Sequence, residues 1–176
     1  MSQIRICRIT PEKQADINLK NEPFPLFGKM LPSYQNGKWA YTTQPLNTPG
    51  EDLFPDENYD FQAMEHTHLC IGAYQDDVCI GLAIFEKQWH KYLYLSDLKV
   101  NRAFRRQGIA SRIMQEAECW AKELSYRGIW TVGQDNNLAA CLFYIRNGFQ
   151  IGGLNTKVYN GTKLEGVSDI HFYKDF

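Results

Sequence analysis

Apolar residues recur at helical spacing over one long stretch of the chain, from Ile109 to Leu124. The positions on this apolar stripe are Ile109, Ala110, Ile113, Met114, Ala117, Trp120, Ala121 and Leu124. Polar and charged residues fill the other positions, as on a helix that packs one face against a sheet. The preceding segment, Tyr92 to Val100, is rich in aromatic and branched residues and predicts a strand.

Shorter apolar runs predict two hairpins. Leu69 to Tyr74 and Val78 to Phe85 flank a polar turn, and we expect this hairpin to pair onto the strand at Tyr92 to Val100. Phe149 to Val158 and Val167 to Tyr173 flank a second turn region and predict the second hairpin. An α/β fold follows, in which helices cover the faces of a sheet.

Prolines and a glycine interrupt the stretch from Pro45 to Asp60, which contains few periodic apolar residues. This composition predicts a long loop, and long loops in compact domains are often functional or disordered.

Length and composition favour a single globular domain over residues 1–176. A chain of 176 residues with 44% hydrophobic and 14% aromatic content can bury a core without disulfides or metals. It contains no apolar run of about 18 residues, and its start lacks the apolar core of a secretory signal. We therefore expect a cytoplasmic protein with no membrane partner.

The five cysteines are odd in number and widely scattered, and no Cys-x-x-Cys pair occurs. This usage predicts reduced core residues rather than disulfides, nucleophiles or ligands. His66 and His68 would lie on one face of a strand, but with no third ligand nearby we expect no metal site.

Charge is segregated along the chain although its net value is only −1, which argues against a nucleic-acid partner. Between Lys38 and Lys87 there is no lysine or arginine. The acidic residues of this stretch are Glu51, Asp52, Asp56, Glu57, Asp60, Glu65, Asp76, Asp77 and Glu86. Two interpretations stay open: a solvated face, or a surface that attracts a polycationic substrate.

The turn before the long helix has the features of an anion site. Gly108 would let the backbone approach a ligand, and the N–H groups of the helix start point toward the same place. Such a helix start binds anions, pyrophosphate above all. Arg102, Arg105 and Arg106 would add positive charge there, which a turn alone does not need.

Two sequence blocks resemble the GCN5-related N-acetyltransferase (GNAT) superfamily. The first is Arg105-x-x-Gly108-x-Ala110 between strand and helix, which is similar to the acetyl-CoA signature of these enzymes. The second runs from Asn137 to Phe149, after a strand predicted at Ile129 to Val132, and resembles the family's second helix. The resemblance implies a mixed, mostly antiparallel central sheet with helices on both faces.

Features elsewhere resemble the streptothricin acetyltransferases in particular and are spread over nearly the whole chain. They are Glu22-Pro23-Phe24, Gly28-Lys29, Pro32-x-Tyr34, Trp39, the junction Gln134 to Leu138, and Phe172-Tyr173. By this resemblance the acceptor is a small cationic amine, the β-lysine amine of streptothricin, whose acetylation confers antibiotic resistance. The acidic stretch would suit such a substrate. Tyr34, Trp39 and Phe24 could form an aromatic wall for it, although aromatic residues more often pack in a core.

The resemblance also implies a set of residues that bind the cosubstrate acetyl-CoA. These are the main chain at Leu98, Lys99 and Val100, the turn and helix start at Arg105, Arg106, Gln107, Gly108, Ile109, Ala110 and Ser111, and Asn137 and Ala140 on the second helix. The Val100 N–H would donate to the oxyanion. Asn137 is also a favoured helix N-cap, and that role alone would explain it.

Tyr144 and Asp97 are the catalytic candidates. By resemblance, Tyr144 is the acid that protonates the leaving thiolate, because a phenol stays protonated at neutral pH; its other interpretation is a packing residue. Asp97 lies on the strand before the turn and could be the base, bind the substrate ammonium, or only hydrogen-bond a loop. Strand alternation would place Ser96 and Asp97 on opposite faces. Glu86 is a weaker candidate for the base. A chain of water molecules could also carry the proton away, in which case no base would be needed.

Two alternative functions stay open. The enzyme could acetylate another amine, such as a polyamine, a protein lysine or an N-terminus, or the chain could be a non-catalytic acyl-CoA-binding module. The sequence does not decide whether the protein is a homodimer.

Overall fold

The computed structural model describes residues 3–176, and internal contacts group them into two compact units. The first unit contains the residues up to Pro23, Leu53–Ile129 and Phe176, and the second contains Phe24–Asp52 and Trp130–Asp175.

The sheet of the first unit has the strand order β1-β4-β5-β6, and neighbouring strands are antiparallel. The strands are β1 (Arg5–Arg8), β4 (His68–Gln75), β5 (Val78–Glu86) and β6 (Tyr92–Val100). Asp76 and Asp77 join β4 to β5 with φ of 47° and 64°, a left-handed conformation that Asp tolerates and that a two-residue hairpin turn requires. The predicted hairpin and its pairing onto Tyr92–Val100 are confirmed.

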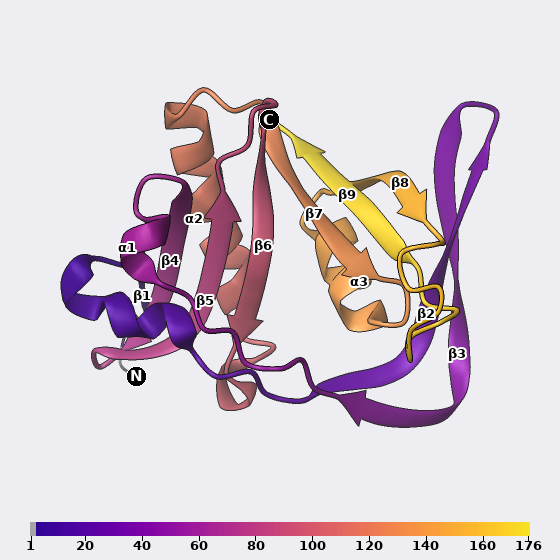
Figure 1. The fold of residues 1–176 in the computed structure, drawn as a ribbon, viewed down its shortest axis with the longest axis horizontal. Coiled ribbons are helices and arrows are strands. Elements are labelled where there is room, and N and C mark those ends of the chain that lie inside the picture. Colours follow the sequence, from indigo (N-terminus) through magenta and orange to yellow (C-terminus); the bar gives the residue numbers. More distant parts are fainter. Residues whose placement is uncertain (1–2) are drawn as a thin grey trace. The chain divides into compact units, whose positions relative to one another are not determined.

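Helices cover both faces of this sheet (Figure 1). They are η1 (Pro11–Asn18) and α1 (Phe61–Met64) on one face and α2 (Ile109–Glu123) on the other, while η2 (Arg102–Phe104) lies in the connection between β6 and α2 (Figure 1). The predicted long helix is confirmed as α2, and it buries Ile109, Ile113, Met114, Ala117 and Ala121. Leu124, placed on the stripe by its spacing, is instead 41% exposed, because the helix ends at Glu123 and Ser125 turns the chain with a positive φ.

The face of the sheet that η1 and α1 cover holds an apolar cluster. It consists of Ile9, Ile17, Met64, Cys70, Leu82 and Ile84, with Leu19, Tyr59 and Phe61 packed against it. Leu82 and Ile84 alternate with Ala83 and Phe85 along β5, which are also buried and face the other side, so the strand is buried on both faces.

The second unit contains a long hairpin that corrects one prediction. Its strands, β2 (Phe24–Gln35) and β3 (Lys38–Asp52), are antiparallel, so the loop expected at Pro45 to Asp60 is a strand as far as Asp52. Prolines fit because pairing passes from Gly28↔Pro45 directly to Leu26↔Gly50, which leaves Pro49 in an irregular part of the ladder. A two-stranded ribbon also has an open edge on each strand, where a missing N–H costs little.

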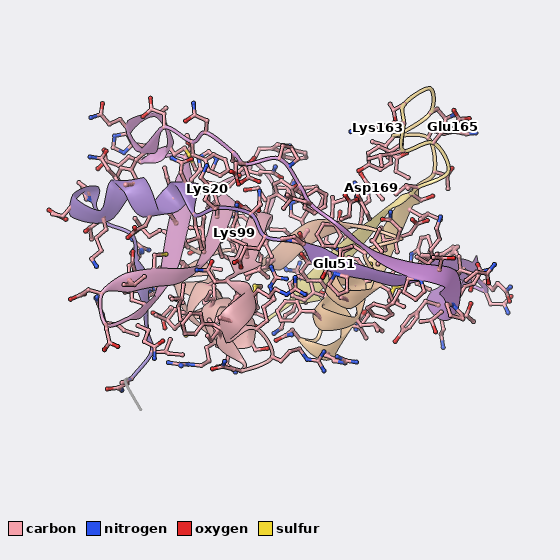
Figure 2. The ribbon with its side chains drawn as sticks, turned by 90° about the horizontal axis from the view of Figure 1, so that it is seen from below. Lys20, Glu51, Lys99, Lys163, Glu165 and Asp169 are labelled. Atoms are coloured by element: carbon pink, nitrogen blue, oxygen red, sulfur yellow. The ribbon has the colours of Figure 1, made fainter. Side chains whose placement is uncertain are left out.

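The rest of the second unit is β7 (Gly128–Gln134), α3 (Leu138–Arg146), β8 (Gln150–Asn155) and β9 (Asp169–Asp175). The antiparallel pair of β8 and β9 confirms the second predicted hairpin, although β8 is shorter than predicted and β9 begins and ends two residues later. The connection between these strands carries Lys163 and Glu165, away from the strands (Figure 2). The predicted helix after Asn137 is confirmed as α3, and it contacts β2.

The structure thus has the predicted α/β fold with mostly antiparallel pairing. All five cysteines are free, as expected; Cys70, Cys79 and Cys141 are buried, but Cys119 is exposed. None of the helices in residues 3–176 is both long enough and apolar enough to cross a bilayer. Over the same residues, no group of three His, Cys, Asp or Glu side chains could hold a metal ion.

Gly28→Ala is expected to destabilise the protein, because a Cβ at this position would lie 2.7 Å from Leu138 Cδ2 and 2.9 Å from the Gln44 carbonyl oxygen. Overpacking of this kind costs about 1–3 kcal/mol. Gly50→Ala on the same hairpin is the matched control, since its Cβ would meet nothing within 4 Å and should change stability by about 0.5 kcal/mol at most. The free energy of urea unfolding measures both, and equal values would contradict the packing argument.

Candidate active site

The turn between β6 and α2 is open on the side where the predicted anion site would lie. Arg106 and Gly108 have φ of 64° and 78°, and a Cβ built on Gly108 would meet no atom within 4 Å. The first turn of α2 has no side-chain cap and no acidic residue, so its N–H groups remain available to a ligand. The local geometry therefore fits the diphosphate of a coenzyme.

The Arg105 side chain stabilises this turn from within the protein. Its Nε donates to the Val100 carbonyl at 2.8 Å, and its two terminal nitrogens donate to the carbonyls of Pro23 at 2.6 Å and Glu22 at 3.2 Å. The Glu22 carboxylate also accepts from the Arg102 backbone N–H. Arg105 thus connects the end of β6 to the segment before β2, and its donors are taken by the protein, which leaves the main-chain amides of the turn as donors to an anion.

The other predicted coenzyme-binding residues of the turn differ in exposure. Arg106, Gln107 and Gly108 are exposed, and the Gln107 amide donates to the Ala103 carbonyl at 3.1 Å. Ile109 is buried and anchors the start of α2. Ala110 and Ser111 are partly buried on its first turn.

A β-bulge in β6 decides where Asp97 points. Asp97 pairs with Ile84 and Leu95 pairs with Phe85, so Ser96 is an extra residue, and its hydroxyl donates to the Ile84 carbonyl at 3.2 Å. The bulge interrupts the regular alternation from which opposite faces for Ser96 and Asp97 were predicted. Asp97 consequently lies on the Ile84 side of the sheet, the side that η1 covers.

The same strand continues through the residues predicted to bind the coenzyme with their main chain. Leu98, Lys99 and Val100 pair in register with Ala83, Leu82 and Gly81 of β5.

Asp97 belongs to a buried ion network. Lys99 Nζ lies 2.9 Å from Asp97 Oδ2 and 2.6 Å from Glu57 Oε2, and the Tyr59 hydroxyl lies 3.5 Å from Asp97 Oδ2. Only 11% of the Asp97 side chain and 9% of the Lys99 side chain are exposed. Burial raises the pKa of Asp97 above its ordinary value, Lys99 opposes this increase, and Glu57 adds to it.

The pKa values of the two carboxyl groups are shifted in opposite directions from their ordinary values. Burial also acts to raise the pKa of Glu57, but the hydrogen bond from Lys99 and further hydrogen bonds outweigh it, so the pKa of Glu57 is lowered. Lys99 and the other donors thus outweigh burial at Glu57, whereas burial prevails at Asp97. Glu57 and Tyr59 were not singled out from the sequence as partners of Asp97; the one signal was the position of Glu57 in the acidic stretch.

In the second unit, Asn137 is the N-cap of α3, and its side-chain oxygen accepts from the Ala140 backbone N–H at 3.2 Å. This confirms the structural interpretation of Asn137. An isolated β-bridge joins Asn137 to Gly28 of β2, so this helix start is held by the hairpin as well.

Tyr144 lies on α3 among aromatic side chains and is 8% exposed. Its ring centroid is 5.3 Å from that of Phe172 and 5.6 Å from those of Phe143 and Phe149. The packing interpretation therefore holds for the ring. Such packing also fixes the position of the phenol, which an acid catalyst requires.

The structure also places the other candidates that the sequence suggested. Glu86, on β5, lies 3.9 Å from His68, and His66 lies in the turn before β4 rather than on a strand with His68. Tyr34 and Trp39 pack together at the exposed end of the β2/β3 hairpin with ring centroids 5.0 Å apart, and Tyr34 remains exposed.

Several residues of the acidic stretch are paired with cations from outside it. Asp56 binds Lys20 at 2.8 Å, and Asp77 binds Arg5 at 3.1 Å. Asp60 instead caps α1 through its side chain. These pairs reduce the negative field that the sequence suggested.

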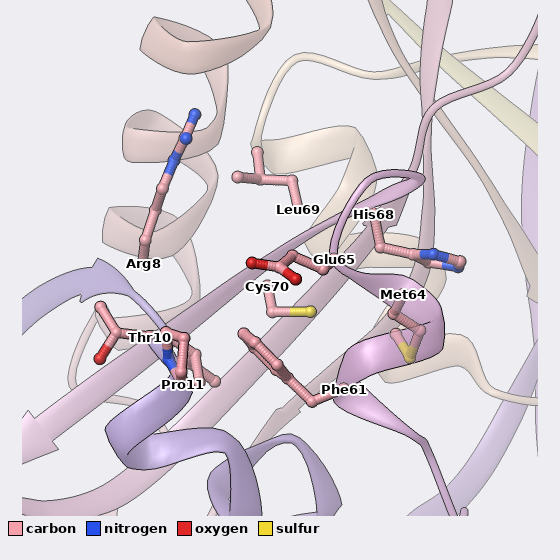
Figure 3. A pocket seen from close by; sticks show the side chains of 10 residues that line it. Arg8, Thr10, Pro11, Phe61, Met64, Glu65, His68, Leu69 and Cys70 are labelled. Atoms are coloured by element: carbon pink, nitrogen blue, oxygen red, sulfur yellow. The ribbon is translucent and has the colours of Figure 1, made fainter.

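A hollow lies in each unit, and the one in the second unit is bordered by Phe149, which packs against Tyr144. One, in the first unit, is bordered by Ile9, Phe61, Met64 and Cys70 (Figure 3), and burial raises the pKa of the Cys70 thiol to about 11. The other, in the second unit, lies between residues 37–41 and residues 145–151.

The model of the acetyltransferase (GNAT) family matches residues 32–149. Streptothricin acetyltransferase A of Bacillus subtilis is 30% identical over 97% of this chain and 99% of its own length. This chain belongs to the GNAT family. The family, the N-acetyltransferase activity and the acetyl-CoA cosubstrate predicted from the sequence are confirmed.

Further relatives agree with this GNAT assignment. The streptothricin acetyltransferase of Streptomyces lavendulae is 30% identical over 73% of this chain and 71% of its own. A protein of Bacillus anthracis str. Ames, assigned as a streptothricin acetyltransferase and solved with acetyl coenzyme A, superposes with a TM-score of 0.89 at 25% identity. That superposition covers 99% of this chain and 100% of the other. A nourseothricin acetyltransferase shares the fold, with a TM-score of 0.80 at 22% identity, over 98% of each chain.

Arg105→Lys is expected to raise the KM for acetyl-CoA about tenfold, because the single ammonium of lysine cannot replace three nitrogens of a planar fork that each reach a different carbonyl. This change corresponds to about 1.4 kcal/mol, the value of roughly one charge-assisted hydrogen bond. Steady-state kinetics with varied acetyl-CoA measure it. Arg106→Lys keeps the same charge one residue away and serves as the control; an equal KM increase in both variants would contradict the stabilising role of Arg105.

Proposed function

We propose that this GNAT enzyme acetylates the β-lysine amine of streptothricin and so confers resistance to the antibiotic. The observation that carries the proposal is similarity over the whole chain to the Bacillus subtilis enzyme, at 30% identity, including the segments outside the coenzyme-binding blocks. In this proposal residues 1–176 act as one acetyltransferase domain. The proposal includes a cytoplasmic location, which the free cysteines favour.

The first unit would bind the coenzyme and prepare the amine. The main-chain amides of Gly108, Ile109 and Ala110 would hold the diphosphate, and the Leu98–Val100 main chain would hold the pantetheine arm. The ammonium form of a lysine-type amine has a pKa of about 10.4, so a proton must be removed before the amine can attack the thioester. Asp97 would accept it, because a buried carboxylate with a raised pKa is a stronger base than an exposed one.

The second unit would supply the acid. Tyr144 would donate its hydroxyl proton to the departing thiolate, whose parent thiol has a pKa of about 8.5. Asn137 and Ala140 would add contacts to the pantetheine arm. The aromatic packing of Tyr144 supports the proposal, because it restricts the ring to one position.

The deciding experiment is mass spectrometry of streptothricin after incubation with acetyl-CoA and the purified protein. We expect one added acetyl group on the β-lysine moiety, together with free coenzyme A thiol. A polyamine, a lysine peptide and a peptide with a free N-terminus are tested in parallel. If only one of these other amines is acetylated, that amine replaces streptothricin as the acceptor. If the protein binds acetyl-CoA but releases no coenzyme A thiol with any of the amines, it is an acyl-CoA-binding module.

Tyr144→Phe is expected to lower kcat about a hundredfold or more, because the acid is lost while the ring packing remains. The unfolding free energy should fall by about 1 kcal/mol at most. Tyr126→Phe makes the same chemical change beyond the end of α2 and is the matched control. Unchanged kcat in the Tyr144 variant would remove the acid assignment.

A further inference from the structure

Asp97, Lys99 and Glu57 form a cluster of charged side chains on the face of the sheet that η1 covers. The cluster contains two carboxylates and one ammonium, so its charges do not balance. Asp97 and Glu57 each contact the ammonium of Lys99, at 2.9 and 2.6 Å, so one cation serves two carboxylates. Lys99 and Asp97 are almost completely buried, whereas 30% of the Glu57 side chain is exposed. Buried charges that are incompletely paired have strongly altered proton affinities.

The segment that carries Glu57 and Tyr59 is held by the end of η1 and by the chain that follows it. Asn18 exchanges two hydrogen bonds with the Tyr59 main chain, at 2.7 and 3.0 Å. The Asn21 side chain donates to Glu57 Oε2 at 3.0 Å and to the Pro55 carbonyl at 2.8 Å. Glu57 is therefore held in place beside Lys99 by contacts that do not involve Asp97.

We infer that Lys99 and Glu57 are positioning residues for Asp97: Lys99 keeps its carboxylate ionised, and Glu57 weakens that effect by sharing the ammonium. Asp97 would thereby remain a carboxylate near neutral pH and still be basic enough to accept a proton. This inference names a regulation of the proposed base and rests on the proposed function. It concerns the Lys99 side chain, whereas the coenzyme assignment concerns its main chain.

Two further groups, Tyr59 and Asp56, affect the charge balance at Asp97. The Tyr59 hydroxyl donates weakly to Asp97 at 3.5 Å, and burial together with the negative charges of Asp97, Glu57 and Glu86 raises the pKa of Tyr59, so it stays protonated. Asp56 adds negative charge near Lys99 but is paired with Lys20. Lys99 and Glu57 are thus the groups whose removal changes the balance at Asp97 most, and in opposite directions.

The test is a carbon-detected NMR titration of the Asp97 carboxyl in the full chain. Lys99→Met should raise the Asp97 pKa by about one pH unit or more, as expected when an opposite charge at this distance is lost. Glu57→Gln should lower the Asp97 pKa, because Lys99 then serves Asp97 alone. Lys99→Arg keeps the charge and should restore a value close to that of the wild type.

The acid limb of the kcat profile should follow these changes, since a base is active only when it is ionised. The limb should move to higher pH in Lys99→Met and to lower pH in Glu57→Gln. Lys20→Met is the matched control: it breaks the exposed pair with Asp56 and leaves the partners of Asp97 in place, so titration and profile should move much less than in Lys99→Met. Lys20 and Lys99 are both marked in Figure 2.

Outcomes separate this inference from the proposed function. The inference would be overturned if the Asp97 pKa were the same in Lys99→Met, Glu57→Gln and the wild type and if activity fell equally at every pH. Lys99 and Glu57 would then have only a structural role. Opposite movements support the inference. The titration needs no substrate, so a wild-type enzyme that fails to acetylate streptothricin would reject the proposed acceptor without affecting the titration result.

Discussion

One extra residue in β6 determines which chemistry the first unit can present. Ser96 forms a bulge between the Ile84↔Asp97 and Phe85↔Leu95 pairs, so the register changes between Leu95 and Asp97. Leu95 keeps its place on the apolar face opposite the cluster of Ile84. Asp97 and Lys99 lie on the face of Ile84 and Leu82 and carry charge into a layer that is otherwise hydrophobic. Without the bulge, Asp97 would share a face with Leu95.

A buried charge needs partners, and this requirement gives a role to the segment Leu53–Asp60. It has no regular structure, yet Asn18 and Asn21 hold its main chain and side chains through several hydrogen bonds. Glu57 and Tyr59 reach Lys99 and Asp97 from this segment. The loop is thus not only a connection: it completes an ion network that β6 alone leaves unbalanced.

Elements with a strong period were predictable, and features that depend on one residue were not. The stripe on α2 and the hairpin of β4 and β5 follow from spacing and turn chemistry. The β2/β3 hairpin was not predicted, and its part beyond Pro45 was taken for a loop because an irregular ladder tolerates prolines that a regular strand would exclude. The bulge at Ser96 has no sequence signature, and therefore the neighbours of Asp97 could not be predicted. The sequence indicated that Arg105 places a positive charge at the turn. It did not show that the guanidinium donates hydrogen bonds to three main-chain carbonyls.

Structural and catalytic roles need not compete at a single residue. Asn137 caps α3 and Tyr144 packs among Phe143, Phe149 and Phe172, and each of these roles accounts for the side chain without any ligand. A group that acts on a coenzyme must be held within a fraction of an ångström of its working position, and packing and capping provide that restriction. The same argument applies to Arg105, whose contacts with the protein hold the amides of the turn in place. In each case the structural contact is what would make the chemical role possible.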